Sequence, residues 1–372
     1  MASMELVELL RLILLCHIPV WKPFLVNAGG CGILIHMFAI SRSDFDLDRL
    51  GLETPIARID RALKQLWEGD EAKTRASLIN LAIYTEDGCQ LMADNELLDH
   101  VAARHACRAL LILALPEAQP PRARAWIQAL CRPYQGKQIV CSEQISFVLE
   151  GGNAAQVQNI VFAHLDSDLP LVVWWQADLS KNFEERLYSR IDTLIIDSSR
   201  WADPARQFDA LLAAMNAETG GFDVRDLAWT RSHFMRTALA TCFQDATACH
   251  NLSKLETIHI THRKGQRTTA LLLAVWINQR LKADLSVELV EKDTGPALQS
   301  LVLEGAGVRG EVRRECDSCF VRVSATCGEI TREDLLPADV DSDAELVTEL
   351  LSRFHGSTLY SSMLPFVHSM LK

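Results

Sequence analysis

Cys316 and Cys319 stand three positions apart, the spacing found in redox-active and in zinc-binding cysteine pairs. Zinc needs further ligands, and no second Cys-x-x-Cys accompanies this pair. His259 and His262 are also three apart, but a predicted strand would point them to opposite faces. A thioredoxin-type redox pair begins a helix, whereas the flanks here predict strands. We therefore expect no metal site. A redox pair and two incidental reduced cysteines both stay open.

Asp197, Ser198 and Arg200 end the apolar run TLIIDSSR. In α/β proteins, ligand sites gather where parallel strands end. Arg231 follows later in the chain, and an arginine side chain can hold a phosphate with two hydrogen bonds. These residues predict a binding pocket at the strand end. The alternative is turn chemistry, since Asp and Ser also bond the backbone where a strand gives way to a loop.

Signatures of catalysis and of nucleotide binding are missing from the sequence. There is no Walker phosphate loop, no Gly-x-Gly-x-x-Gly after a strand and no Gly-x-Ser-x-Gly. The segment GAGVRG at 305–310 predicts a hairpin turn instead. A formal net charge of -11 argues against a general nucleic-acid binder. We expect no catalytic residue, no cofactor and no nucleic-acid partner.

Hydrophobic periodicity indicates which elements position these residues. Short apolar runs such as CRALLILAL and LPLVVWW alternate with amphipathic segments such as DPARQFDALLAAMNAE. This alternation predicts an α/β N-terminal domain with a mixed sheet covered by helices on both faces. The mixture arises because ARAWIQALC and KQIVCSEQISF have no helix between them and should form a hairpin. Strand runs framed by helices then predict a smaller α+β C-terminal domain. The expected ranges are 37–217 and 218–372, and the boundary is the segment ETGGFDVRD, which begins at Glu218 and contains Gly220-Gly221.

Residues 1–36 are expected to be an N-terminal extension. It is either disordered or the result of a start codon chosen too far upstream. The apolar stretch 1–40 raises the question of a membrane anchor, but charges and prolines interrupt it, so membrane association is not expected. Eleven cysteines, an odd number, argue against a secreted disulfide framework and favour the cytoplasm. Most of them are expected to be small buried hydrophobic residues.

Three phrases, in order, carry a family resemblance: HLDSDLPLVVWWQADL, then TLIIDSSRWADP, then DLAWTRSHFMRTALATCF. Together they resemble the glucose-6-phosphate dehydrogenase assembly protein family, OpcA, over about residues 54–335. The resemblance implies a non-catalytic protein that binds glucose-6-phosphate dehydrogenase and promotes its active oligomer or its affinity for glucose 6-phosphate. It places the chain in the oxidative pentose phosphate pathway and the supply of NADPH. In photosynthetic members this action is linked to thiol redox state.

Two departures from the family pattern matter. The aromatic before Arg236 is displaced by one position, to Phe234, and neither Cys316 nor Cys319 matches a family redox cysteine. These two cysteines are therefore weak redox candidates. The candidates for partner binding or for the domain junction are Trp174, Trp175, Asp197, Ser198, Arg200, Trp201, Trp229, Thr230, Arg231 and Arg236.

The double tryptophan is expected to place one indole deep in the sheet and the other nearer the edge where Trp229 and Arg231 enter. Two other functions remain as alternatives to an activator of the dehydrogenase. One is a sugar-phosphate-binding protein or enzyme with a pocket near Asp197–Arg200. The other is a thiol-regulated adaptor.

Overall fold

The computed structural model describes residues 47–67, 73–134, 138–179, 182–244, 250–314, 319–338, 342–352 and 358–372. The expectations for residues 1–36, for the apolar stretch 1–40 and for Cys316 concern residues outside these ranges. That unit comprises residues 50–372. Across the described residues, no helix is both long enough and apolar enough to cross a bilayer.

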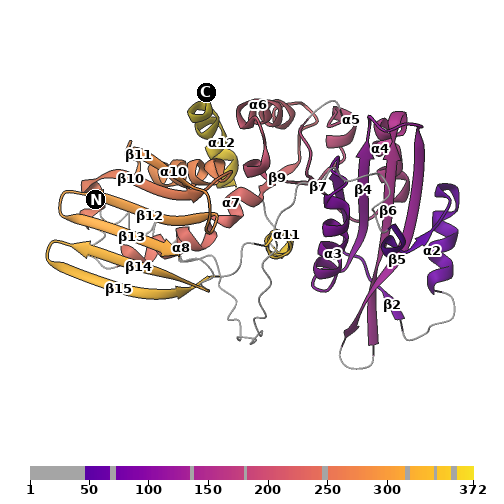
Figure 1. The fold of residues 1–372 in the computed structure, drawn as a ribbon, viewed down its shortest axis with the longest axis horizontal. Helices are drawn as coiled ribbons and strands as arrows, with labels where there is room; N and C mark the ends of the chain where they lie inside the picture. Colours follow the sequence, from indigo (N-terminus) through magenta and orange to yellow (C-terminus); the bar gives the residue numbers. More distant parts are fainter. Residues whose placement is uncertain are drawn as a thin grey trace. The chain divides into compact units, whose positions relative to one another are not determined.

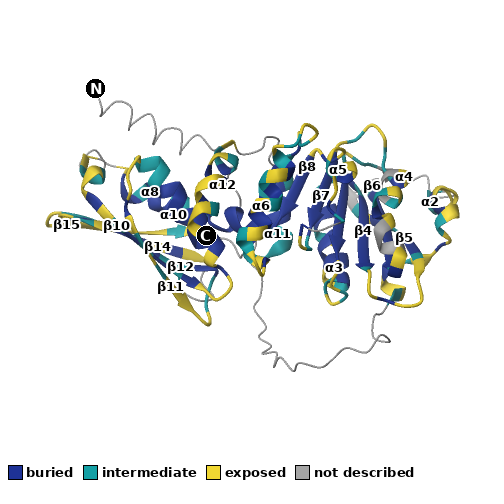
Figure 2. Ribbon diagram, turned by 90° about the horizontal axis from the view of Figure 1, so that it is seen from above, coloured by how far each residue is buried: buried dark blue, intermediate teal, exposed yellow. Residues whose placement is uncertain are grey.

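Two sheets organise the described chain (Figure 1). The first contains β1 (Leu52–Glu53), β2 (Lys73–Arg75), β3 (Ile79–Thr85), β4 (Cys107–Leu115), β5 (Arg122–Tyr134), β6 (Gln138–Glu150), β7 (Leu171–Trp175), β8 (Thr193–Ile196) and β9 (Asp223–Asp226). Its helical segments are η1 (Leu47–Leu50), η2 (Ile56–Arg58), α2 (Ile59–Trp67), α3 (Gln90–Ala102), η3 (Gly151–Gln156), α4 (Val157–His164), α5 (Glu185–Tyr188), η4 (Ser198–Arg200) and α6 (Pro204–Met215). Figure 2 shows α3 on one side of this sheet and α4 on the other.

The predicted α/β N-terminal domain with a mixed sheet is confirmed. Strands β6, β4, β3, β7, β8 and β9 lie side by side and parallel, whereas β5 pairs antiparallel with β6, as the hairpin predicted. Numbered along the chain, the six parallel strands have the spatial order 3-2-1-4-5-6. This is the order of doubly wound dinucleotide-binding sheets, in which the direction of winding reverses between the first and fourth strands. Here that reversal falls between β3 and β7.

Local sequence explains where these elements begin. Asp203 caps α6 by accepting a hydrogen bond from the Arg206 amide at 3.1 Å, and Pro204 opens the helix, as expected.

Strand β9 pairs with β8, which places residues 223–226 in the first sheet. The division at 217/218 stays a prediction, and a boundary drawn between the two sheets falls after Asp226.

The C-terminal domain is built on the second sheet, in the order β11-β10-β12-β13-β14-β15. Its strands are β10 (Leu255–Arg263), β11 (Ser286–Lys292), β12 (Leu298–Gly305), β13 (Val308–Arg314), β14 (Phe320–Cys327) and β15 (Ile330–Pro337). The remaining helical segments are α7 (Leu227–Arg231), α8 (His233–Cys242), η5 (Asn251–Lys254), α10 (Arg267–Leu281), α11 (Asp343–Ser352) and α12 (Thr358–Leu371). All pairings are antiparallel except that of β10 with β11. GAGVRG forms the predicted hairpin turn between β12 and β13, with Gly307 at φ 73°.

The double tryptophan lies in β7, between β3 and β8 in the middle of the first sheet. Trp174 and Trp175 are each 1% exposed, so both indoles are deeply buried. That one of them lies nearer the edge where Trp229 and Arg231 enter stays a prediction. The Trp175 ring stacks on Tyr84 at 3.8 Å between centroids. Because neighbouring side chains of a strand point to opposite faces, β7 buries one indole in each layer of side chains.

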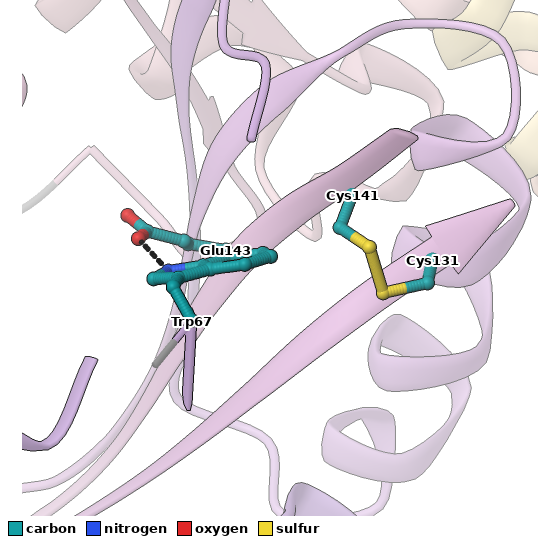
Figure 3. Close-up of a disulfide and its surroundings, with 4 residues drawn as sticks. All are labelled: Trp67, Cys131, Cys141 and Glu143. Carbon is teal, nitrogen blue, oxygen red and sulfur yellow. Dashed lines mark hydrogen bonds between the residues drawn. A yellow bond between two sulfur atoms is a disulfide. The ribbon is translucent and has the colours of Figure 1, made fainter. Parts of the chain in front are cut away.

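The cysteines only partly follow expectation. Cys107 and Cys242 are buried free thiols, and burial raises the pKa of each to about 12. Cys131 and Cys141, however, form a disulfide across β5 and β6 (Figure 3). These two therefore depart from the expectation of small buried hydrophobic thiols, because the hairpin register sets them directly opposite each other.

Candidate functional site

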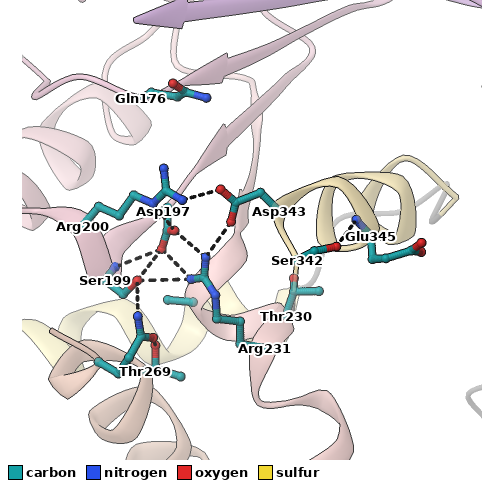
Figure 4. A network of polar contacts seen from close by, with 12 residues as sticks. Gln176, Asp197, Ser199, Arg200, Thr230, Arg231, Thr269, Ser342, Asp343 and Glu345 are labelled. Atoms are coloured by element: carbon teal, nitrogen blue, oxygen red, sulfur yellow. Dashed lines mark hydrogen bonds and ion pairs between the residues drawn. The ribbon is translucent and has the colours of Figure 1, made fainter. Parts of the chain in front are cut away.

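Asp197 and Arg231 form the centre of a polar network at the carboxyl end of β8 (Figure 4). Arg231 Nη1 donates to Asp197 Oδ1 at 2.8 Å, and Nη2 donates to Oδ2 at 2.6 Å. Ser199 donates its hydroxyl to Asp197 Oδ1 at 2.6 Å. Asp197 follows β8 directly and Arg231 ends α7, so the network joins two elements that sequence reasoning had singled out separately.

A second carboxylate completes this network. Asp343, the first residue of α11, accepts from Arg231 Nη2 at 3.2 Å and also pairs with Arg200. Arg200 in turn lies 3.1 Å from Asp197 through its Nε atom. Sequence reasoning missed Asp343, since a lone aspartate at a helix start is an ordinary N-terminal residue. Both guanidinium groups are thus already engaged by carboxylates.

Burial and charge act against each other on the central pair. Burial by itself would raise the pKa of Asp197, but the hydrogen bonds and positive charge of Arg231 outweigh it and hold that pKa below its ordinary value. For Arg231, burial would lower the pKa, and the hydrogen bonds and charge of Asp197 raise it above the ordinary value. Both groups are therefore charged at neutral pH, as a bidentate ion pair.

Asp226 forms a second buried hub beside the first. Its Oδ1 accepts from the amides of Ser198 at 3.0 Å and Ala228 at 2.9 Å, and its Oδ2 accepts from the Tyr360 hydroxyl at 2.8 Å. Ser198 also donates its hydroxyl to Oδ2. Burial, followed by the negative charge of Asp197, raises the pKa of Asp226 to about 6. Thr230, another candidate, donates its hydroxyl to the Asp226 carbonyl oxygen at 3.0 Å.

The tryptophan candidates are buried side chains. Trp201 is 8% exposed and meets Phe208 edge-on, with the ring centroids 5.0 Å apart. Trp229 is 6% exposed and lies under the guanidinium of Arg236, whose Cζ is 3.6 Å from the ring centroid. The roles of these residues at a junction or partner surface stay proposals. What the structure itself gives for Trp201 and Trp229 is that both side chains pack inside the protein.

A buried acid missed by sequence reasoning lies next to the network. Asp94 of α3 accepts from the side-chain amide of Gln176 at 2.8 Å, while its Oδ2 has no partner among the described residues. Burial raises the pKa of Asp94 to about 7. The residue borders a cavity of about 270 Å³ between α3 and α11, which Gln90, Leu97 and Asp343 also line.

The turn after β3 is the position where this strand order would receive a dinucleotide. In such folds the pyrophosphate sits on the first amides of the helix that follows the first strand. Here Asp87 Oδ1 already accepts from the Cys89 amide at 2.9 Å, immediately before α3. Glu86 stands beside it and accepts from the Tyr84 hydroxyl at 2.6 Å. Two acidic side chains therefore precede Gly88 in the turn where the phosphates of a dinucleotide would lie.

The metal and thiol candidates lie apart from this network. Within the part of the chain that the structure describes, no three His, Cys, Asp or Glu side chains gather so as to hold a metal ion. Cys319 is an exposed free thiol at the start of the β14 region, and its predicted partner Cys316 lies outside the described residues. The redox role of this pair remains a prediction.

Comparison with known proteins adds two family matches. The model described as the glucose-6-phosphate dehydrogenase subunit N-terminal domain matches residues 98–213, and the corresponding C-terminal domain model matches residues 223–364. Among curated relatives, proteins named OxPP cycle protein OpcA are 25% identical over 189 residues in Synechocystis sp. and 26% identical over 187 residues in Synechococcus elongatus. These alignments cover 50% and 49% of this chain, but only 39% and 41% of the relatives.

Solved structures give a more distant likeness. A 3-ketoreductase from Actinomadura kijaniata aligns with 79% of this chain and 95% of its own, at 11% identity and a TM-score of 0.44. An aldose-aldose oxidoreductase from Caulobacter crescentus aligns with 78% and 96%, at 10% identity and a TM-score of 0.40. Scores this low carry no argument about activity. The two domain models, which follow one another along the chain, settle its family: it belongs to the OpcA family of glucose-6-phosphate dehydrogenase assembly proteins.

Proposed function

We propose that this protein is a non-catalytic assembly factor and allosteric activator of glucose-6-phosphate dehydrogenase. It would act in the cytoplasm and support the oxidative pentose phosphate pathway and its supply of NADPH. The support is membership of a family whose domain models are named for a subunit of that dehydrogenase. The chain spans about two fifths of the length of its curated relatives, so the partner is part of the proposal.

The observation that carries the non-catalytic part is the acidic turn after β3. A dinucleotide brings two negative phosphates to this turn, and Glu86 and Asp87 would repel them. Asp87 also occupies the Cys89 amide that would otherwise donate to a phosphate oxygen. The fold thus retains the strand order of a dinucleotide-binding sheet, while the turn disfavours the dinucleotide.

The test combines the purified protein with the dehydrogenase from the same organism. We expect a lower KM for glucose 6-phosphate, a higher kcat or a larger dehydrogenase oligomer, measured by steady-state kinetics and light scattering. The dehydrogenase with an equal mass of albumin is the control. Unchanged kinetics and an unchanged oligomer would refute the activator. Reduction of NADP⁺ by this protein alone, with glucose 6-phosphate, would refute the non-catalytic part.

The sugar-phosphate alternative places its pocket at Asp197–Arg200. There Arg200 and Arg231 already pair with Asp197 and Asp343, so a phosphate would have to displace a carboxylate from each guanidinium. Thermal shift with a panel of sugar phosphates separates the two functions. Stabilisation by a sugar phosphate but not by the dehydrogenase would favour the alternative.

The thiol-regulated adaptor is tested by replacing Cys316 and Cys319 with serine. Binding of the dehydrogenase by this variant should respond to oxidant and reductant as the parent protein does. A response present in the parent and lost in the variant would support the adaptor instead.

A further inference from the structure

The second sheet has one face that no described helix or strand covers. Helices α8 and α10 pack on this sheet, and Figure 2 shows both on the same side. The residues facing them, including Ile260, Leu301 and Val312, are buried. Side chains alternate along a strand, so the residues between these point to the opposite face. We call that opposite face the open face.

Strand register arranges the open face in rows that cross the sheet. The acidic row consists of Glu288, His259, Val302, Glu311, Ser324 and Glu333. The neighbouring basic row consists of Val290, Thr261, Ser300, Arg313, Arg322 and Leu335. The two rows are two residues apart along every strand, which corresponds to about 7 Å.

The ends of the basic row are apolar and exposed. Leu335 on edge strand β15 is 59% exposed, and Val290 on edge strand β11 is 37% exposed. Phe320, also on the open face next to Arg322, is 51% exposed. Large apolar side chains at these positions distinguish the open face from a fully solvated sheet face.

Charges on the open face are only partly paired within the chain. Glu288 pairs with His259 at 2.7 Å, and Glu333 lies 3.8 Å from Arg322. Arg313, in the middle of the basic row, is exposed and has no hydrogen bond or ion pair among the described residues. Its neighbour across the rows, two residues along β13, is Glu311, whose Oε2 accepts from Arg309 at 3.0 Å. The centre of the open face therefore presents Arg313, unpaired among the described residues, beside a carboxylate that is already engaged within the chain.

We infer that a second copy of this chain packs on the open face, with the acidic row of each copy over the basic row of the other. A two-fold axis along the rows, midway between them, exchanges the rows. It sets Glu311 against Arg313 of the second copy, and the same contact forms a second time by symmetry. The pairing matters because the chain carries a net charge of -11, so two copies repel unless the contact surface holds both signs.

The size of the open face suits such a dimer. Strands about 4.8 Å apart and about seven residues long give a six-stranded sheet an area on the order of 600 Å². Two copies would bury about 1,200 Å² in total, at the lower end of specific protein interfaces. A dimer of modest affinity that weakens with salt is expected.

The experiment is a charge swap read by light scattering on the full chain. The parent protein should approach twice its chain mass of 41.5 kDa as its concentration rises. Arg313→Glu places like charges in both symmetric contacts and should raise the dimer dissociation constant about tenfold or more. Adding Glu311→Arg to it reverses both signs, and this double variant should dimerise again. Arg61→Glu, an exposed change of the same charge on α2, is the matched control and should dimerise as the parent does.

Each outcome decides the inference. A parent protein that stays monomeric at high concentration would overturn it, as would a dimer unaffected by Arg313→Glu. A double variant that remains monomeric, with an unchanged thermal unfolding curve, would show that the two residues do not meet across a two-fold axis. If the parent is monomeric alone and Arg313→Glu abolishes dehydrogenase binding, the open face belongs to the dehydrogenase and self-association is refuted.

Discussion

The two terminal nitrogens of Arg231 reach the two carboxylate oxygens of Asp197 at 2.8 and 2.6 Å, although the residues are 34 positions apart. The side chains are 6% and 4% exposed. A buried pair of this kind fixes the end of β8 relative to α7, because neither charge can remain inside the protein without the other.

Removing the arginine should therefore destabilise the fold strongly. Arg231→Met leaves the Asp197 carboxylate buried without its partner, and we expect the free energy of unfolding to fall by about 3–5 kcal/mol. Arg231→Lys keeps the charge but loses the paired hydrogen bonds, so a loss of about 1–2 kcal/mol is expected. Urea unfolding measures both. Arg186→Met replaces an exposed residue on α5 and should change the free energy of unfolding by less than about 0.5 kcal/mol. Equal losses for Arg231→Met and Arg186→Met would contradict the argument.

The buried carboxyl of Asp94 should make stability depend on pH. Its pKa is raised from 3.8 to about 7, so the folded protein keeps a proton that the unfolded chain releases between those values. Stability contributed at this site is consequently present at low pH and decreases as the pH rises from about 4 to about 7.

Replacing Asp94 with Asn removes the titrating group and keeps an acceptor for Gln176. At pH 8 the variant should be more stable than the parent by on the order of 4 kcal/mol, and the difference should shrink towards pH 4. Chemical unfolding at several pH values measures the gap. A gap that stays constant with pH would show that Asp94 is not the titrating group.

The hydroxyl of Tyr360 provides one of the hydrogen bonds to Asp226 Oδ2. Tyr360→Phe keeps the ring and removes this donor to a fully buried carboxyl, so a loss of about 1–3 kcal/mol is expected. Tyr188→Phe, at a half-buried position whose ring contacts are retained, serves as the comparison and should change stability by less than about 0.5 kcal/mol. Similar values for the two variants would mean that the Asp226 hub contributes little.

The Cys131–Cys141 disulfide closes a short loop in the β5–β6 hairpin, with a sequence separation of 10. Loop closure of this length predicts that the bond stabilises the fold by about 2–3 kcal/mol. Replacing both cysteines with serine should produce that loss under oxidising conditions. Addition of a reductant should lower the stability of the parent protein to that of the variant and leave the stability of the variant unchanged. A parent protein insensitive to reductant would contradict the prediction.

Strands β4, β7 and β8 and helix α6 could be predicted because each carries its own signal, a continuous apolar run or a cap followed by proline. Helix α12 and strand β15 have no such signal. Pro365 lies inside α12, where proline normally argues against a helix, and nearly every residue of β15 is exposed, so no alternation marks it. Helix α12 is placed by its packing on α6 and α10, and β15 by its antiparallel pairing with β14.

Half of the polar network was predictable for the same reason. Asp197 and Arg200 stand at a strand end, and strand ends can be found in the sequence. Asp343, Asp94 and Tyr360 could not be found, because each comes to the site from a helix far away in the chain and has an ordinary local context. Their roles arise from tertiary contacts alone.

Asp226 caps α7, ends β9 and accepts a hydrogen bond from Tyr360, which lies 134 residues later. During synthesis, β9 leaves the ribosome long before Tyr360 does, so this carboxyl must wait for its last donor. A chain truncated before α12 should accordingly lose stability at β9, in the N-terminal sheet.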